Sequence, residues 1–282
     1  MLRRRAGFTL VEVMVGLVIL GLVVALLYRS VISSQRVSQA QVERAAMQAN
    51  IRAAAFIVPA ELYEVAAGPG STTDILAMSP TAITYRAMRG LGVICQVAGN
   101  EVRVQRDQGR WFALRQPQAG RDSVLLFVDG DPGTDTDDAW IPLRITSVNM
   151  SSRCGALPAI ALGATVPNPA AVTLGSPART FEVMELSLYT SAGDRALGLR
   201  SVSGGGSTQP ILGPLAANGF RLVYRDASGN PTTVRSAVRS IEVQVRGVTA
   251  RPIAGGAGLS GARQVMGDSL TTFLLLRNGA WP

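Results

Sequence analysis

The sequence predicts an α+β protein in which one long N-terminal α-helix packs on a C-terminal antiparallel β-sheet. The chain has 282 residues, of which 47% are hydrophobic and 16% charged, so it can bury a substantial core. An apolar run near the N-terminus leads into a stretch of good helix formers that contains no Gly or Pro. Short runs rich in β-branched and aromatic residues follow, separated by turn residues, and this pattern is typical of antiparallel hairpins.

Residues 8–27 are predicted to form a transmembrane helix. The segment FTLVEVMVGLVILGLVVALL is apolar apart from Thr9, Glu12 and its glycines, and at 1.5 Å per residue it spans about 30 Å, the thickness of a bilayer core. Arginines precede the segment and the bulk of the chain follows it, which predicts a cytoplasmic N-terminus and an exported body. A secretory signal peptide would be shorter in its apolar part and would end in a small-residue cleavage site, whereas YRS follows directly here.

The helix is expected to continue into water over residues 28–65. Pro59 is expected to kink or interrupt it, residues 61–65 to add another turn, and the GPG at 68–70 to end it. One face recurs at helical spacing and is predicted to pack on the sheet, unless part of it contacts another chain instead. That face consists of Val42, Ala45, Ala46, Ala49, Ala53, Phe56, Ile57 and Ala60.

Residues 66–282 are predicted to form a β-rich extracytoplasmic domain. A sub-domain boundary is expected near 155–178, where Pro and Ala accumulate, or near 203–219, which begins with a Gly- and Ser-rich stretch typical of linkers. The predicted strands are 83–86, 93–97, 101–106, 111–115, 124–128, 140–148, 181–190, 220–225, 238–248 and 270–277.

The composition excludes several classes of chemistry. Lys and His are absent and all 27 basic residues are Arg, so no Ser-His-Asp or Cys-His nucleophile and no lysine Schiff base can form. We therefore do not expect an enzyme. Part of the net charge of +8 comes from the adjacent arginines at 3–5, and nucleic-acid binding is not favoured. Trp111, Trp140 and Trp281, with Arg residues near the first, are interpreted as strand packing rather than as a base-stacking platform.

The most specific motif stands at the start of the apolar run. A short Arg-rich leader, residues 1–7, is followed by the sequence GFTLVE, which runs from Gly7 to Glu12. This arrangement resembles the class III signal of type IV pilins and type II secretion pseudopilins. The resemblance implies that prepilin peptidase, a membrane aspartyl peptidase, cuts between Gly7 and Phe8 and that Phe8 is then N-methylated. Glu12 becomes the fifth residue of the mature chain.

The same resemblance implies a role for Glu12 in assembly. A carboxylate in an apolar span costs about 2.5 to 3.5 kcal/mol at mid-membrane and needs a partner. Cleavage creates an α-amino cation at Phe8 that can pair with Glu12 of a neighbouring subunit, so that stacking of subunits neutralises both charges. The implied partners are other pilins or pseudopilins in a filament, prepilin peptidase and the lipid of the inner membrane.

The expected function is that of a minor pilin-like structural subunit of a type IV pilus, because the body is longer than a small major subunit needs. A minor pseudopilin of a type II secretion system shares every N-terminal feature and is the alternative. The alternatives of a different class are a membrane-anchored exported enzyme and a calcium-dependent adhesin.

Five Asp residues gather between two predicted strands at 129–138. Asp129, Asp131, Asp135 and Asp137 alternate on a turning loop and offer the hard oxygen ligands that Ca²⁺ accepts, although the spacing lacks the glycine and the terminal Glu of an EF-hand loop. A solvated turn is the alternative interpretation. No other cofactor is expected.

Cys95 and Cys154 are the two cysteines of the chain, and both lie in the part expected outside the cytoplasm, where a pair is more often oxidised than free. They form either one disulfide or two separately buried thiols, and they are too few for a four-thiolate zinc site. The sequence GAGLSG at 256–261 matches a dinucleotide-binding pattern formally, but it lacks the strand-turn-helix setting and is interpreted as a hairpin loop.

Overall fold

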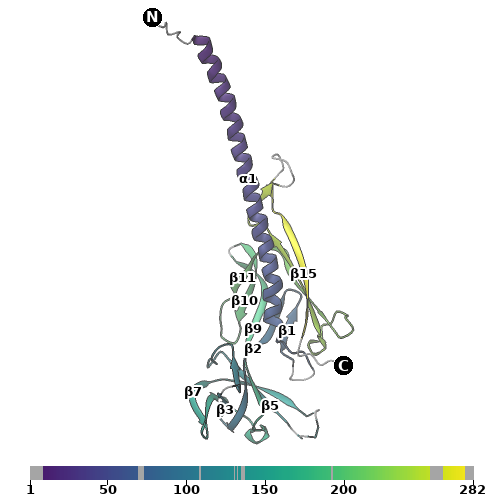
Figure 1. Cartoon of the computed structure of the whole chain (residues 1–282). Helices are drawn as coiled ribbons and strands as arrows, with labels where there is room; N and C mark the ends of the chain where they lie inside the picture. The colour runs from purple at the N-terminus through teal and green to yellow at the C-terminus, as the bar shows by residue number, and fades with distance from the viewer. Residues whose placement is uncertain are drawn as a thin grey trace. The chain divides into compact units, whose positions relative to one another are not determined.

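The computed structural model describes residues 9–68, 73–107, 109–129, 131, 133–134, 137–191, 193–254 and 263–276. These residues form one α-helix, two short 3-10 helices and fifteen strands, so the predicted α+β class is confirmed. The helices are α1 (Leu10–Leu62), η2 (Pro169–Ala171) and η3 (Arg235–Ala237) (Figure 1). The strands are β1 (Ile75–Ser79), β2 (Ala82–Ala98), β3 (Glu101–Gln105), β4 (Trp111–Ala113), β5 (Ser123–Val128), β6 (Ala139–Arg144), β7 (Ser147–Cys154), β8 (Leu157–Gly163), β9 (Pro177–Ser191), β10 (Asp194–Ser201), β11 (Gln209–Arg225), β12 (Ser240–Val248), β13 (Ile253–Ala254), β14 (Arg263–Gln264) and β15 (Gly267–Leu275).

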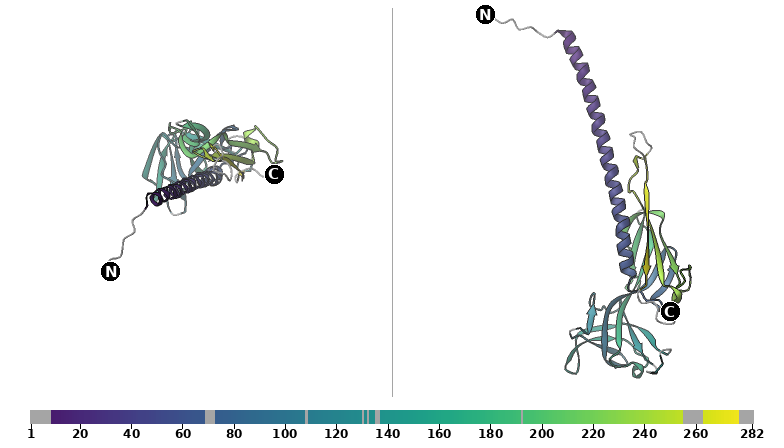
Figure 2. Two further views of the ribbon diagram at one scale, coloured as in Figure 1. Left: turned by 90° about the horizontal axis from the view of Figure 1, so that it is seen from above. Right: turned by 45° about the vertical axis from the view of Figure 1, so that its right-hand side comes forward.

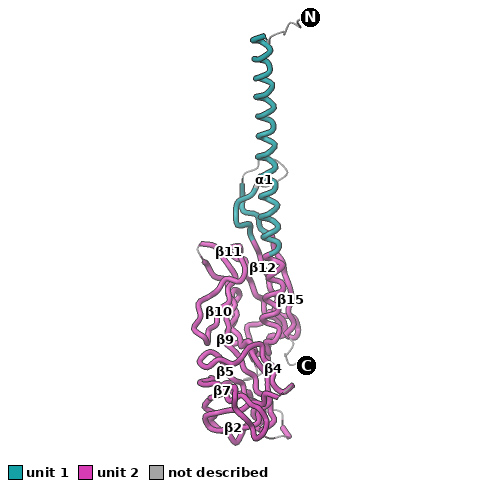
Figure 3. Tube along the Cα trace, turned by 60° about the vertical axis from the view of Figure 1, so that its left-hand side comes forward, with its two compact units in different colours: residues 1–49, 248–267 teal, residues 50–247, 268–282 magenta. Residues whose placement is uncertain are grey.

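The chain divides into two compact units, which Figure 3 shows in different colours. The first unit comprises residues 1–49 and 248–267, and the second comprises residues 50–247 and 268–282. The first unit therefore joins the N-terminal part of α1 to a segment that is distant in sequence and contains β13 and β14. The second unit holds the last turns of α1 and most of the strands.

Thirteen of the strands form one antiparallel sheet whose main path is β15-β12-β11-β10-β9-β2-β3-β8-β7. The long strands β2 and β9 form the central pair of this sheet. They pair from Ala82 opposite Ser187 to Val93 opposite Pro177. β1 and β4 pair with β2, while β5 pairs with β9 and β6. β13 and β14 form a separate two-stranded sheet.

The last turns of α1 pack into the larger of two hydrophobic cores in the second unit. Ala54, Val58 and Leu62 are completely buried there, together with strand residues such as Tyr85 and Phe220. Hydrogen bonds tie both ends of this helical segment to the sheet. Asn50 Nδ2 donates to the Gly213 carbonyl at 2.8 Å, and the Tyr85 hydroxyl donates to Glu61 Oε2 at 3.1 Å.

The predicted buried face of the helix is wrong for most of its members, although Ala53 is partly buried and packs against the larger core. The residues that are buried in this part of α1 are Met47, Ile51, Ala54, Val58 and Leu62, which recur at spacings of three and four. Phe56 and Val42, which belong to the predicted face, are 77% and 65% exposed. The predicted face was rich in Ala, whereas the observed one carries longer aliphatic side chains, which gain more free energy from burial.

The helix also continues through Pro59, which was expected to kink or interrupt it. α1 includes Pro59 and ends at Leu62, so the expected extra turn over 61–65 is present only in part. Pro removes one hydrogen bond from a helix interior. Here it lies in the last turn, and the completely buried Val58 and Leu62 hold that turn on the sheet.

A second core lies around β3, β5 and β8, the strands at one end of the second unit (Figures 1 and 2). Its fully buried side chains include Val102, Val124, Ile145 and Ile160. The Pro- and Ala-rich segment at 155–178 contains β8 and contributes to this core. The Gly-rich stretch after residue 203 lies in the loop that joins the paired strands β10 and β11.

Candidate functional site

The N-terminus of α1 is capped by Thr9 and Glu12, which form hydrogen bonds to each other in both directions. The backbone N–H and the hydroxyl of Thr9 donate to Glu12 Oε2 at 2.9 and 3.0 Å. In return, the backbone N–H of Glu12 lies 3.3 Å from Thr9 Oγ1. This is the capping box, in which Thr at the N-cap and Glu three residues later satisfy amide groups that a helix start leaves open. It fixes the position of the Glu12 carboxylate at the helix end.

Glu12 is the one charged residue between positions 10 and 27. Its Oε2 atom receives both bonds from Thr9, while Oε1 receives none from the part of the chain that the structure describes. The carboxylate is therefore held in place with one oxygen open to a cation from outside the chain. The N-terminal end of a helix also favours a negative charge, because the backbone dipoles point their positive ends there.

The surrounding helix is apolar on all sides. α1 is long and apolar enough to cross a membrane, and its most hydrophobic window has a mean hydropathy of 2.9 with no residue buried inside the protein. Gly16 and Gly21, the two glycines of this stretch, have open space where a side chain would stand. A helix that is hydrophobic all round needs lipid or other chains around it. Gly7 and Phe8, the predicted cleavage and methylation positions, lie outside the described residues.

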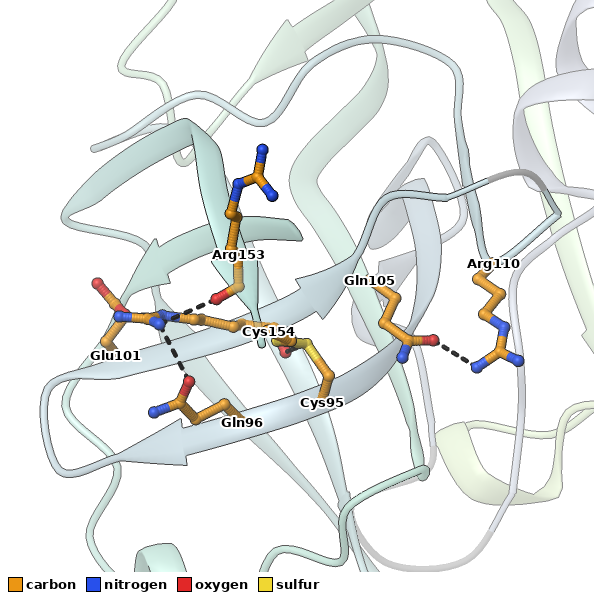
Figure 4. The surroundings of a disulfide bond; sticks show 8 residues. Cys95, Gln96, Glu101, Gln105, Arg110, Arg153 and Cys154 are labelled. Atoms are coloured by element: carbon orange, nitrogen blue, oxygen red, sulfur yellow. Dashed lines mark hydrogen bonds and ion pairs between the residues drawn. A yellow bond between two sulfur atoms is a disulfide. The ribbon is translucent and has the colours of Figure 1, made fainter. Parts of the chain in front are cut away.

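The two predicted disulfide candidates are joined in the second unit. Cys95 of β2 and Cys154 at the end of β7 form a disulfide, and their Cα atoms are 6.1 Å apart. Figure 4 shows the surroundings of this bridge, with Gln96 and Arg153 close to it, and Arg103 connects the same strands by hydrogen bonds to these two residues. Its Nη1 atom donates to Gln96 Oε1 and to the Arg153 carbonyl, each at 3.0 Å. The bridge therefore ties β2 to β7.

Of the predicted calcium ligands, the structure describes Asp129, Asp131 and Asp137, while Asp135 lies outside the described residues. The backbone N–H of Asp131 donates to Asp137 Oδ2 at 2.8 Å, and Asp131 Oδ1 accepts from the Gly133 N–H at 3.1 Å. Within the described residues, no group of three or more acidic or cysteine side chains is arranged to hold a metal. The calcium site stays a prediction.

The described tryptophans take part in packing. Trp140 stacks edge-to-face on Phe127, with ring centroids 5.4 Å apart, and the Arg179 guanidinium lies 5.9 Å from its ring centroid. Trp111 packs against the second core. Trp281, the third predicted member of the group, lies outside the described residues.

Sequence reasoning missed a buried ionic cluster in the second unit. The Glu182 side chain on β9 is completely buried and binds Arg89, Arg115 and Arg121, with N···O distances of 3.0, 3.0 and 2.5 Å. It also accepts a hydrogen bond from Ser201. Burial alone would raise the pKa of the Glu182 carboxyl, but the four hydrogen bonds outweigh it and lower the pKa from 4.5 to about 2.

A neighbouring carboxylate completes this cluster. Asp122 is also completely buried and accepts two hydrogen bonds from Arg115, at 2.7 and 2.6 Å. The signal in the sequence was a carboxylate at position 182 between the apolar Phe181 and Val183 of a strand. Its partners could not be identified, because they come from loops and strands 61 to 93 positions away. The cluster connects parts of the sheet, and both of its carboxylates are completely buried.

Residues 2–28 match a protein-family model, the prokaryotic N-terminal methylation motif. This is the prepilin-type signal of type IV pilins and pseudopilins, and it confirms the resemblance inferred from GFTLVE. The match supports a type IV pilin-like or pseudopilin subunit, a class that is generally non-enzymatic. The searches of curated proteins and of solved structures found no significant match.

Proposed function

We propose that the chain is a minor pilin-like structural subunit of a type IV pilus. In this proposal, prepilin peptidase removes residues 1–7 and methylates the new N-terminus at Phe8. The mature subunit waits in the inner membrane as a single-pass protein, with its N-terminus on the cytoplasmic side and its β-rich body exported. It performs no catalysis and enters the filament through the N-terminal half of α1.

The pairing of charges drives assembly in this proposal. The new α-amino group at Phe8 of one subunit docks against Glu12 of its neighbour, and the pair neutralises two charges that would each be costly alone in an apolar environment. The apolar helices then pack against one another in the filament core. The β-rich bodies stay outside, where their loops are free to make other contacts.

One observation carries the proposal. Glu12 is the sole charge in an 18-residue apolar stretch of α1, and the capping box with Thr9 presents it with one oxygen unoccupied within the described residues. The match of residues 2–28 to the methylation motif supports this pairing, since the proposed cleavage after Gly7 would leave a free amine at Phe8.

Intact-mass and N-terminal peptide analysis of the protein from its native membrane tests the maturation step. The expected chain begins at methylated Phe8, and the variant Gly7→Arg is expected to keep its leader. A chain that retains Met1, or one cut beyond Leu27, would remove the proposal. A chain that begins at Phe8 in the Gly7→Arg variant would remove the proposed cleavage site.

The assembly step is tested with Glu12→Ala. This variant is expected to insert into the membrane and to lose its leader normally, but to be absent from purified filaments on immunoblots. Thr9→Ala is the matched control, because it removes the capping box, a loss of about 1 kcal/mol, and leaves the carboxylate in place. It should still enter filaments. Normal incorporation of Glu12→Ala would contradict the pairing of charges.

A minor pseudopilin of a type II secretion system is the second candidate, since the methylation motif fits both kinds of filament. Deletion of the gene separates them. Loss of surface pili with normal secretion of exoproteins supports the pilus, whereas the reverse supports the secretion system. Calorimetry of the full chain in detergent with Ca²⁺ tests the predicted site at 129–138. The absence of a binding heat would contradict the alternative function of a calcium-dependent adhesin.

A further inference from the structure

Within the described residues, five strands of the large sheet have a neighbour on one side only: β1, β4, β6, β7 and β15. An edge strand presents a row of unpaired backbone N–H and C=O groups, to which a strand of another chain can bind. Natural proteins protect such edges by making them short or irregular, or by covering them. Four of the five edges in this sheet are protected, and β15 is the exception.

The four protected edges differ in how they are protected. β4 has three residues, and β6 contains Pro142, which cannot donate a hydrogen bond to another strand. The Arg235 guanidinium donates to the Leu76 carbonyl of β1 at 2.6 Å. On β7, the Arg106 guanidinium donates to the Met150 carbonyl at 2.6 Å, where the register of the pairing with β8 is interrupted. Each of these edges is therefore short, irregular or occupied by a side chain.

β15 is long and regular by comparison. It has nine residues, contains no Pro, and has Asp268 near its start as its one charged residue. Two hydrogen bonds flank its pairing with β12. The Thr249 N–H donates to the Met266 carbonyl at 2.8 Å, and the Leu276 N–H donates to the Arg239 carbonyl at 3.0 Å. Because hydrogen-bonded positions alternate along an antiparallel pair, the even-numbered residues of β15 face β12 and the odd-numbered residues face the open edge.

The open edge combines unpaired backbone groups with exposed apolar side chains. The N–H groups of Thr271, Phe273 and Leu275 point away from β12, and no backbone group of the described residues pairs with them. The side chains of Phe273 and Leu275 are 65% and 61% exposed. Leu274 and Leu276, which point to the other face, are buried in the larger core and fix the strand in place. The edge is therefore a rigid template for a further strand.

A second copy of the chain does not fit this edge in the antiparallel arrangement. Within the second unit, β15 runs beside the last turns of α1 and along them (Figures 1 and 2). Antiparallel pairing of two β15 strands would therefore point the last turns of α1 in the two copies in opposite directions. Two chains anchored in one membrane by this continuous helix cannot adopt that arrangement. A parallel pair is less stable per residue, so the edge fits a strand of a different chain.

We propose that β15 is a docking edge, to which an extended segment of a different protein chain adds as a further strand of the sheet. The segment pairs its backbone with Thr271, Phe273 and Leu275. Its side chains beside Phe273 and Leu275 are β-branched or aromatic, since such cross-strand pairs are favourable. It carries no charge on the inner face, where it lies beside Leu274. This inference goes beyond the proposed function and does not depend on which filament the chain joins.

A synthetic peptide tests the proposal. The probe is the peptide SVTVTVS with fluorescein at its N-terminus and an amide at its C-terminus, and fluorescence anisotropy measures its binding to the full chain in a nonionic detergent. Saturable binding is expected, and hydrogen exchange should show that the bound peptide protects residues 267–275. The same peptide with N-methylated valines keeps its side chains but loses the N–H groups that face β15. It should bind at least about ten-fold more weakly, because about three hydrogen bonds are lost.

Variants of the chain locate the binding. Phe273→Ala should weaken binding of SVTVTVS about two- to five-fold, because it removes one cross-strand pair. The matched control is Phe112→Ala, which removes a ring of β4 that is 63% exposed and should leave binding unchanged. Thr271→Pro removes an N–H that faces the open edge, a change that edge strands tolerate, and should weaken binding about three- to ten-fold. Circular dichroism checks that each variant folds, and the pair of Phe variants decides if Thr271→Pro does not fold.

Several results would overturn the proposal. These are the absence of saturable binding, equal binding of the N-methylated peptide, protection by the peptide outside residues 267–275, and an equal loss of binding in Phe112→Ala and Phe273→Ala. A dimer in native mass spectrometry that Thr271→Pro dissociates, without binding of the peptide, would place a second copy of the chain at the edge and also overturn it. None of these measurements depends on maturation at Phe8 or on entry into a filament.

Discussion

The two halves of α1 have the same backbone structure but different surroundings. Between positions 10 and 27 the large apolar side chains are 46% to 77% exposed, and none of them packs in either hydrophobic core that the described residues form. Between positions 50 and 62, Ile51, Ala54, Val58 and Leu62 are at most 4% exposed. The second half is therefore stabilised by the chain's own sheet. The first half can gain comparable stability only from lipid or from other chains, as an assembly element should.

The largest expected effect is a loss of stability in the β-rich body when the disulfide is removed. Cys95→Ser combined with Cys154→Ser opens a bridge between residues 59 positions apart, and on the chain-entropy estimate this lowers the free energy of unfolding by about 4 kcal/mol. The helical signal of the first half of α1 should persist. Denaturant titration of the full chain in detergent, followed by tryptophan fluorescence and circular dichroism, measures both.

A reductant supplies the control for the bridge. It should destabilise the native chain by the same amount and leave the double serine variant unchanged. Unfolding of the body at the same denaturant concentration with and without the bridge would mean that β2 and β7 are held together by packing alone.

A pair of identical substitutions compares the two halves of α1 directly. Leu62→Ala removes a completely buried side chain and should lower the free energy of unfolding of the body by about 3 kcal/mol, from lost burial and the cavity left behind. Leu20→Ala removes a side chain that is 58% exposed and should leave that free energy unchanged. Equal effects in denaturant titration would show that the body supports the whole helix.

The features that the sequence predicted correctly are local ones. The GFTLVE motif and the apolar run are contiguous, and the change from helical to alternating periodicity after Gly68 needs no knowledge of tertiary contacts. The prediction of the buried face of α1 was wrong for most residues, because several faces of an Ala-rich helix have similar hydrophobicity. The sheet selects among them through its own shape, which the helix sequence does not encode.

The strands that were missed have a related explanation. β8 reads LPAIALG, and its Ala and Pro residues have low strand propensity, yet it is placed in the sheet by its pairing with β3 and β7. The segment predicted as one strand at 140–148 is divided between β6 and β7. The Glu182 cluster was missed because it assembles arginines that the sequence separates widely.

The Glu182 cluster predicts a pH dependence that belongs to the body alone. A carboxyl group whose pKa falls from 4.5 to about 2 on folding contributes stability that is fully present above pH 4.5. That contribution is lost as the pH falls toward 2, because the unfolded chain binds the proton first. The expected loss is about 2 to 3 kcal/mol, less than the full shift implies because Arg121 is partly exposed.

Denaturant titrations of the full chain between pH 6 and pH 2 measure this loss. Glu182→Gln is the control, and it should be less stable at pH 6 and should lack this part of the pH dependence. The helical signal of the first half of α1 should not follow the same curve. A native chain with the same pH profile as Glu182→Gln would show that the cluster does not hold the sheet.

The smallest expected effect concerns the outward face of the second half of α1. Phe56 is 77% exposed, although Ala54 and Val58 on either side of it in the sequence are completely buried. Phe56→Ala should therefore change the free energy of unfolding of the isolated chain by less than about 0.5 kcal/mol. Phe220→Ala is the matched control, because Phe220 is completely buried and its loss should cost about 3 to 5 kcal/mol. A clear destabilisation by Phe56→Ala would mean that the face is covered within the single chain. If Phe56→Ala has no effect, the Phe56 side chain does not stabilise the isolated chain. Like the apolar side chains of the first half of α1, it would then contribute burial energy only when another molecule covers it.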